Sequence, residues 1–238
     1  INVELSIKNK LQLAEQLHAW LAQDQLPIEK SDDATGDTVD RNEILGERPQ
    51  QALALVEQVA ARWGFILANL DQKLVDVRGK LDELGLDHLS ATLDGRIGAQ
   101  PEALLFDVVQ DHTIRVSWKQ ELRAPLRQIF NGAAYKCILD ECTAIHKRVL
   151  RSRVFVALHM HAGDGNVHTN LPVNSDDYAM LQDAHKAVER IMKLARSLDG
   201  VISGEHGIGI TKLEFLTDDE IREFRDYKQR VDPEGRFN

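Results

Sequence analysis

Histidines are concentrated at residues 159–170, HMHAGDGNVHTN, where their spacing could hold a metal ion. The sequence Ala-Gly-Asp-Gly lies between His161 and His168 and predicts a tight turn with a strand on either side. In the register that we expect, His161 and His168 lie opposite one another, with Cβ atoms about 5 Å apart. That separation suits two imidazoles binding one ion at roughly 2.1 Å each. The alternative is a hydrogen-bonded turn that carries surface histidines.

Alternation along the two strands assigns these polar side chains to one face of the hairpin. His159 and His161 share a face of the first strand, and Asn166, His168 and Asn170 share a face of the second. The two glycines of the turn would relieve crowding where a ligand meets the backbone. The hairpin therefore predicts two metal ligands with amide side chains beside them.

A third ligand is available in the glycine-rich sequence SGEHGIG at 203–209, which contains Glu205 and His206. Glu205 offers an anionic oxygen, and His206 is a side chain suited to proton transfer near neutral pH. Two histidines and one carboxylate leave coordination positions open for a substrate. The alternative is that Glu205 and His206 only stabilise a turn.

The elements expected around these residues follow from apolar periodicity and from capping residues. We expect strands at 153–161 and 166–173, and a strand followed by a loop at 200–207. A helix is expected from a cap at Ser175 to Gly200. A second helix over 218–231 should begin with a capping box formed by Thr217 and Glu220.

Residues 1–130 favour helices that alternate with shorter segments. Helices are predicted at 3–24, at 49–63 with Gly64 as the stop, at 71–85 and at 119–130. Strands are predicted at 65–70, 103–109 and 112–118, turns at 86–101, and a polar loop near 27–48. The fold class is therefore α+β, an antiparallel sheet with packed helices.

Composition excludes several classes of protein. The chain has 238 residues, is 43% hydrophobic and carries a formal charge of -9, which argues against a nucleic-acid partner. No apolar run reaches the roughly 18 residues of a membrane helix, and the first residues do not resemble a secretory leader. Cys137 and Cys142 are expected to be ordinary thiols in a reducing, cytoplasmic compartment. Because the chain starts without methionine, we expect a domain cut from a longer protein.

Three motifs carry a resemblance to a known family: HAGDGNVH at 161–168, GVISGEHGIG at 200–209 and VDPEGRFN at 231–238. They resemble the C-terminal domain of FAD-linked oxidases of the vanillyl-alcohol-oxidase type, a group with D-lactate dehydrogenases, the glycolate oxidase flavin subunit and D-2-hydroxyglutarate dehydrogenase. The similarity covers 150–238, and its details resemble large bacterial proteins that add a flavin domain and an iron–sulfur segment. It implies a ferredoxin-like cap domain. We expect one domain over 1–238, with a helical part at 1–99 and the site region at 100–238.

The resemblance also implies roles for particular residues. A divalent ion (Zn, Mn or Fe) would be bound by His161, His168 and Glu205, and His206 would remove the hydroxyl proton of a small D-2-hydroxy acid while a hydride leaves for FAD. The resemblance implies substrate contacts for Asn170, Arg123 and Lys136, and Arg127 is a cation next to Arg123. It implies flavin contacts for Asn166 and Asn238.

The sequence contains no glycine-rich phosphate loop after a strand, so the FAD should be held mainly by another domain. We therefore expect this chain alone to be colourless and inactive. Its partners would be that flavin domain and an electron acceptor or iron–sulfur segment, in the cytoplasm or peripheral to the inner membrane.

The sequence leaves two other functions open. In a metal-dependent hydrolase, His159 and His161 would form a His-x-His pair at a metal-activated water. Such sites usually take further ligands from later strands, and the only later histidines after His168 are His185 and His206. In a non-catalytic binding module, the same fold would bind a ligand without turnover.

Overall fold

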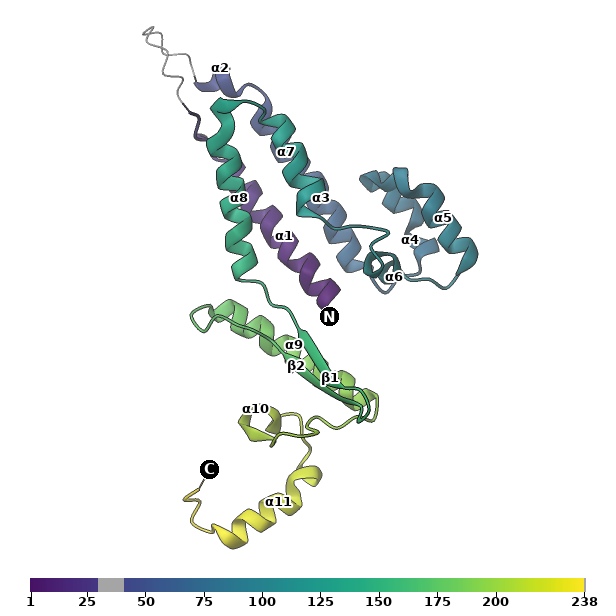
Figure 1. Ribbon diagram of the computed structural model, residues 1–238, viewed down its shortest axis with the longest axis vertical. Coiled ribbons are helices and arrows are strands. Elements are labelled where there is room, and N and C mark those ends of the chain that lie inside the picture. Colours follow the sequence, from purple (N-terminus) through teal and green to yellow (C-terminus); the bar gives the residue numbers. More distant parts are fainter. Residues whose placement is uncertain (30–40, 238) are drawn as a thin grey trace. The chain divides into compact units, whose positions relative to one another are not determined.

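The structure, a computed structural model, describes residues 1–29 and 41–237 (Figure 1). The centre of the predicted loop at 27–48 and the predicted flavin contact Asn238 lie outside these residues. The described chain forms two compact units, Ile1–Phe155 and Val156–Asn238. The assignment of one domain to 1–238 stays a prediction.

The first unit is helical, and three long helices each bury one face in its core. They are α1 (Asn2–Leu21), α3 (Arg48–Ala68) and α8 (Lys136–Arg151), and α1 packs against both of the others. Each has apolar residues at helical spacing on one face, including Leu13, Leu17 and Leu21 in α1. Trp63 of α3 is fully buried, and its Nε1 donates to Oε2 of Glu121 at 2.9 Å.

Shorter helices complete the first unit. They are α2 (Arg41–Leu45), α4 (Leu74–Leu81), α5 (Ser90–Ala99), α6 (Leu105–Gln110) and α7 (Ala124–Ile129). Single helical turns lie at η1 (Asp82–Leu86), η2 (Asp87–Leu89), η3 (Trp118–Arg123) and η4 (Ala133–Tyr135). The helices predicted at 3–24, 49–63, 71–85 and 119–130 are thus confirmed in type, although their ends differ.

Several predictions for this unit are wrong. Gly64 does not end its helix, because α3 continues to Ala68 and buries Ile66; most of the predicted strand 65–70 is therefore helical. A glycine does interrupt the helical backbone further on, at Gly85 in η1, where φ is +85°, a value that only glycine adopts readily. The turns predicted at 86–101 contain α5, and the strands predicted at 103–109 and 112–118 are replaced by α6 and an irregular segment.

Short apolar runs explain these errors, since a buried helix and a buried strand have the same apolar content over six or seven residues. The helix α8 is a further addition that the patterns above do not predict. Both cysteines are free thiols, and burial raises the pKa of Cys142 to about 12.

The second unit contains one antiparallel hairpin and three helices. The strands are β1 (Ala157–His161) and β2 (Asn166–Asn170), followed by α9 (Tyr178–Ser197), α10 (Gly209–Leu213) and α11 (Asp218–Val231). The α+β class is confirmed, and the sheet among the described residues has two strands. No helix in the described part of the chain is long and apolar enough to cross a membrane.

The boundaries in this unit correct three predictions. The first strand begins at Ala157, not at 153, and the segment 200–207 has no strand. The cap of α9 is Asp177, whose side chain accepts from the backbone N–H of Met180 at 3.0 Å, so the cap predicted at Ser175 is wrong. The capping box of Thr217 and Glu220 is confirmed.

Candidate metal centre

The hairpin pairs His161 with Asn166 and His159 with His168. The expectation that His161 and His168 lie directly opposite is therefore wrong. A four-residue turn closes on the pair 161–166, so the partner of His168 is two residues before His161. The two histidines are diagonal neighbours on one face, with ring centroids 5.5 Å apart and ring planes at 73°.

The turn itself has the geometry that its glycines suggest. The N–H of Asp164 donates to the carbonyl of His161 at 3.0 Å, and Gly165 has a φ of +67°. A left-handed residue at this position lets the chain return after four residues, and glycine adopts it without strain. The turn therefore fixes which side chains share the hairpin face.

Glu205 lies against the same face of the hairpin. Its Oε2 is 3.2 Å from Nε2 of His168, and its Oε1 is 3.7 Å from Nε2 of His161. One ligand atom from each of these three residues lies within 4.8 Å of the others, and this is the one such group among the described residues. The three ligands predicted from the sequence are thus brought together.

Two features of His168 match the requirements of a metal ligand. Its side chain is only 18% exposed, and its buried Nε2 makes no hydrogen bond of good geometry, although Oε2 of Glu205 lies 3.2 Å away. A buried polar atom whose hydrogen bond is poorly formed carries an energetic cost that a bound cation would remove. His161 and Glu205 are more exposed, so the group opens toward solvent on one side.

Asn166 positions the carboxylate of Glu205. The Asn166 Nδ2 donates to Oε1 of Glu205 at 2.6 Å. This hydrogen bond is the main reason why the pKa of Glu205 lies below its ordinary value, and His168 and His161 lower that pKa further. The carboxylate is therefore held in its anionic form, which is the form that binds a cation.

Gly204 makes this contact geometrically feasible. A Cβ atom at this position would lie 2.7 Å from Oδ1 and 3.2 Å from Cγ of Asn166. Sequence reasoning missed both Gly204 and the contact of Asn166 with Glu205. The signal available in the sequence was the shared face of Asn166 and His168 on one strand.

His206 and Asn170 lie beside the three ligands. The ring centroid of His206 is 5.6 Å from that of His168, and its side chain is exposed. Asn170 is within hydrogen-bonding distance of His159, with 3.2 Å between Nδ2 and Nδ1. His159 stacks on His168, with centroids 4.5 Å apart, and is not one of the three grouped ligands. The His-x-His pair of a hydrolase therefore gains no support from the geometry.

The predicted cationic substrate contacts belong to the first unit. Arg123 is the last residue of η3, and its Nε is buried without a hydrogen bond. Arg127 lies in α7, and the exposed Lys136 is the first residue of α8. Their contact with a substrate stays a prediction.

Comparison with known proteins relates the C-terminal part of the chain to a described family. Residues 134–238 match the family described as FAD linked oxidases, C-terminal domain. Over these residues the chain is therefore similar to the C-terminal domains of FAD-linked oxidases. No solved structure matches the chain.

Several curated relatives are named D-lactate dehydrogenase or glycolate oxidase subunit GlcD. The chain is 30% identical over 199 residues to D-lactate dehydrogenase [cytochrome] 1, mitochondrial, of Saccharomyces cerevisiae, which covers 82% of the chain and 30% of the relative. It is 36% identical over 87 residues to glycolate oxidase subunit GlcD of Escherichia coli K12, a match that covers 35% of the chain and 17% of the relative. It is 41% identical over 81 residues to D-lactate dehydrogenase of Archaeoglobus fulgidus, a match that covers 33% of the chain and 18% of the relative. The chain spans less than a third of the length of these relatives.

Proposed function

We propose that this chain is the substrate-binding and catalytic part of an FAD-dependent oxidoreductase that oxidises a small D-2-hydroxy acid. In this proposal a divalent ion is held by His161, His168 and Glu205. The observation that carries it is the convergence of three ligand atoms within 4.8 Å of one another, among them the buried Nε2 of His168 beside the Glu205 carboxylate. The names of the relatives, which act on D-lactate or glycolate, supply the substrate class.

The donor set fits a first-row divalent cation. Two imidazole nitrogens and one carboxylate oxygen suit zinc, manganese or iron and leave coordination positions free. When bound, such an ion would supply a Lewis acid that polarises the hydroxyl group of a chelating hydroxy acid. Asn166 would keep the Glu205 carboxylate oriented for that ion through its hydrogen bond of 2.6 Å.

His206 is the proposed base. It follows Glu205 directly, its side chain is exposed, and its ring faces that of His168 edge to face. A neutral imidazole can accept the hydroxyl proton of the substrate at a ring nitrogen near neutral pH. The α-hydrogen would leave with its electron pair for the flavin, which completes a two-electron oxidation to a 2-oxo acid.

The other proposed contacts orient the substrate or the flavin. Asn170 lies on the ligand face of β2, and its amide could donate to a substrate oxygen. Arg123 and Lys136 would bind the carboxylate, for which a guanidinium offers a matching pair of N–H donors. We assign flavin contacts to Asn166 and Asn238, and binding of the FAD phosphates to another domain of the same protein, with an electron acceptor or iron–sulfur segment as a further partner.

A test uses the whole flavin-containing protein in the cytoplasmic or peripheral membrane fraction where we expect it. Flavin reduction is followed spectroscopically with D-lactate, glycolate and D-2-hydroxyglutarate, and with L-lactate as the control. We expect reduction by at least one of the first three, its loss after chelation and its recovery when a divalent ion is returned. Full reduction in a protein shown to be free of metal would contradict the proposed role of the ion.

A further inference from the structure

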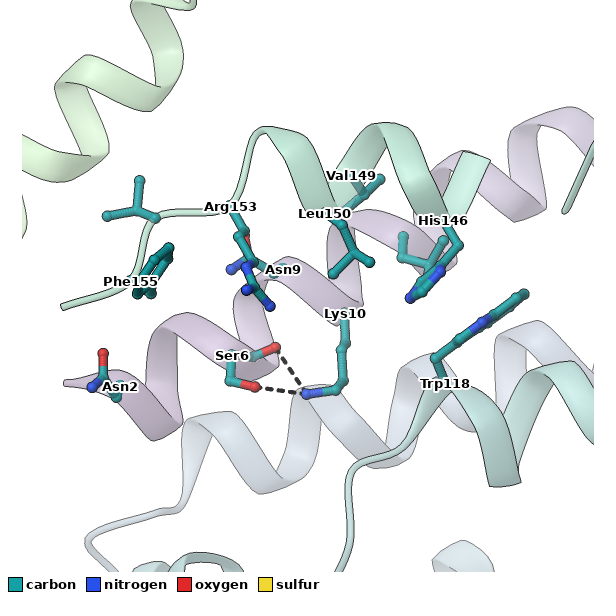
Figure 2. Close-up of a pocket in the computed structure, with 12 residues that line it drawn as sticks. Asn2, Ser6, Asn9, Lys10, Trp118, His146, Val149, Leu150, Arg153 and Phe155 are labelled. Carbon is teal, nitrogen blue, oxygen red and sulfur yellow. Dashed lines mark hydrogen bonds between the residues drawn. The ribbon is translucent and has the colours of Figure 1, made fainter. Parts of the chain in front are cut away.

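The first unit contains a cavity of about 330 Å³ that shares no residue with the histidine cluster. Its walls come from α1, from the start of η3, and from the end of α8 with the segment that follows (Figure 2). Polar groups from Ser6, Asn9 and Lys10 line one wall. The cavity therefore combines helix side chains with a chain segment that ends at Phe155.

Two cations, Lys10 and Arg153, line this cavity. The Nζ of Lys10 donates to Oγ of Ser6 at 2.6 Å and lies 3.4 Å from the Ser6 carbonyl. Arg153 contacts the ring of Phe155, with its Cζ 5.2 Å from the centroid. Figure 2 shows the Arg153 side chain pointing toward α1, on the side that carries Ser6. The contacts described for these two cations are thus with the Ser6 side chain and backbone and with the Phe155 ring.

The acidic group that acts on Lys10 already has other partners. Glu121 raises the pKa of Lys10, but its carboxylate accepts from Arg62 at 3.0 Å and from Trp63 at 2.9 Å. Burial has the larger effect and lowers the pKa of Lys10, and Arg153 lowers it further. The two cations thus repel each other in a partly desolvated space, in a chain whose net charge is -9.

His146 experiences the same excess of positive charge. Burial lowers its pKa, and Arg123, Lys10 and Lys119 lower it further. Like charges at close range destabilise a protein unless an anion lies between or beside them. This part of the first unit is therefore electrostatically suited to an anion.

Apolar and aromatic side chains supply the rest of the lining. Trp118 stacks on His146, with ring centroids 4.9 Å apart and an angle of 15° between the planes. Leu150 and Phe155 also line the cavity and remain 42% and 39% exposed. Apolar groups left in contact with water at a concave surface favour a ligand that has an apolar body.

We propose that this cavity binds a small carboxylate with an aromatic or alkyl body, whose anionic head lies between Lys10 and Arg153. The Ser6 hydroxyl and the Asn9 amide offer further hydrogen bonds to the head. The body of the ligand lies against Trp118, Leu150 and Phe155. This site is additional to the hydroxy acid site proposed above, and it needs neither a metal nor a flavin.

The test measures binding of 3-phenylpropanoate to residues 1–238 by titration calorimetry and by shifts of backbone amide signals in NMR. We expect saturable binding, with shifts at α1, at Trp118 and at the end of α8. Lys10→Met and Arg153→Gln should each weaken binding by at least about tenfold, since each removes one charge-assisted hydrogen bond. Lys10→Arg should retain it, which separates a loss of charge from a loss of fold.

Two controls give outcomes that would overturn the proposal. Lys8→Met removes an exposed lysine of α1 that does not line the cavity, and it should leave binding unchanged. The neutral analogue 3-phenylpropanamide should bind at least about tenfold more weakly than the carboxylate. Three outcomes would each refute the anion site. Lys8→Met could weaken binding as much as the cavity variants do, or the amide could bind as tightly as the carboxylate. The third is a lack of saturation by about 10 mM carboxylate, which means an affinity below that of ordinary ligand binding.

Discussion

The amide of Asn166 is hydrogen bonded to Glu205 at 2.6 Å, and the absence of a side chain on Gly204 leaves room for it. Asn166 belongs to the hairpin and Glu205 to the loop after α9, so this contact joins the two segments that supply the candidate metal ligands. The position of the carboxylate therefore depends on a residue that binds no ion itself.

Gly204→Ala should weaken binding of a divalent ion by about 10-fold to 100-fold, the usual effect of losing an outer partner of a metal ligand. The added methyl group would overlap Asn166 and displace its amide from Glu205. Titration of the metal-free chain with Zn²⁺ or Mn²⁺ measures this effect. Gly207→Ala is the matched control, because a Cβ atom at Gly207 meets nothing within 4 Å. Equal loss in both variants would point to the loop backbone instead of the contact.

The purified chain should bind about one divalent ion per molecule. His161→Ala and His168→Ala should each lower the metal content strongly, because two imidazoles and one carboxylate form a minimal site. Elemental analysis after dialysis gives the stoichiometry. His185→Ala, which removes an exposed histidine of α9 outside the ligand group, should leave it unchanged. Normal metal content in both hairpin variants would rule out this assignment.

His206→Ala should leave the metal content intact and slow substrate oxidation by roughly 10²–10⁴-fold in the flavin-containing protein, as expected for loss of an acid–base group. Substrate affinity should change less, since the proposed metal and cation contacts persist. Turnover, melting temperature and metal content are measured on one preparation. Near-normal turnover with normal melting would remove His206 from the chemistry and leave the proposed role of Glu205 intact.

Acid should loosen the turn after α11 through Asp232. Hydrogen bonds from the backbone N–H of Phe237, from Lys228 and from the N–H of Arg236 hold the pKa of Asp232 at about 2, below its ordinary 3.8. Because the folded pKa is depressed, the stabilising contribution is complete above about pH 4. It is lost as the pH falls from there toward 2.

NMR titration of the Asp232 carboxyl group, together with the amide signals of Arg236 and Phe237, measures this transition. In Asp232→Asn the turn should be loosened already at neutral pH. Asp226→Asn changes an exposed carboxylate of α11 and should behave like the parent chain. A midpoint near the ordinary value of 3.8 would contradict the predicted stabilisation.

The site was more predictable than its surroundings because its residues carry specific chemistry at short range. His161 and His168 are close in sequence, and the glycines of the turn indicate a hairpin. The predicted register is wrong because the four-residue turn pairs His161 with Asn166, which places His159 opposite His168. The glycine-rich motif SGEHGIG identifies Glu205 as a candidate ligand. Its contact with Asn166 depends on packing between distant segments.

The helical unit was less predictable for a different physical reason. Leu105, Val108 and Val109 have helical spacing and are buried in α6, but a run this short fits a strand equally well. Gly64 lies at a point of α3 where a Cβ atom would meet nothing, so its lack of a side chain does not interrupt packing. Such choices depend on which neighbours cover each element, and one sequence does not specify them locally.

The chain length between the ligands determines how an ion at the cluster would affect folding. A link between His161 and His168 closes only the short hairpin turn, which is already formed by backbone hydrogen bonds. A link from His168 to Glu205 instead closes a long segment of chain that contains all of α9. The configurational entropy removed from the unfolded chain grows with the length of the closed segment. The larger part of the loop-closure entropy would thus come through Glu205, whose hydrogen bond to Asn166 already joins the same two segments without the ion.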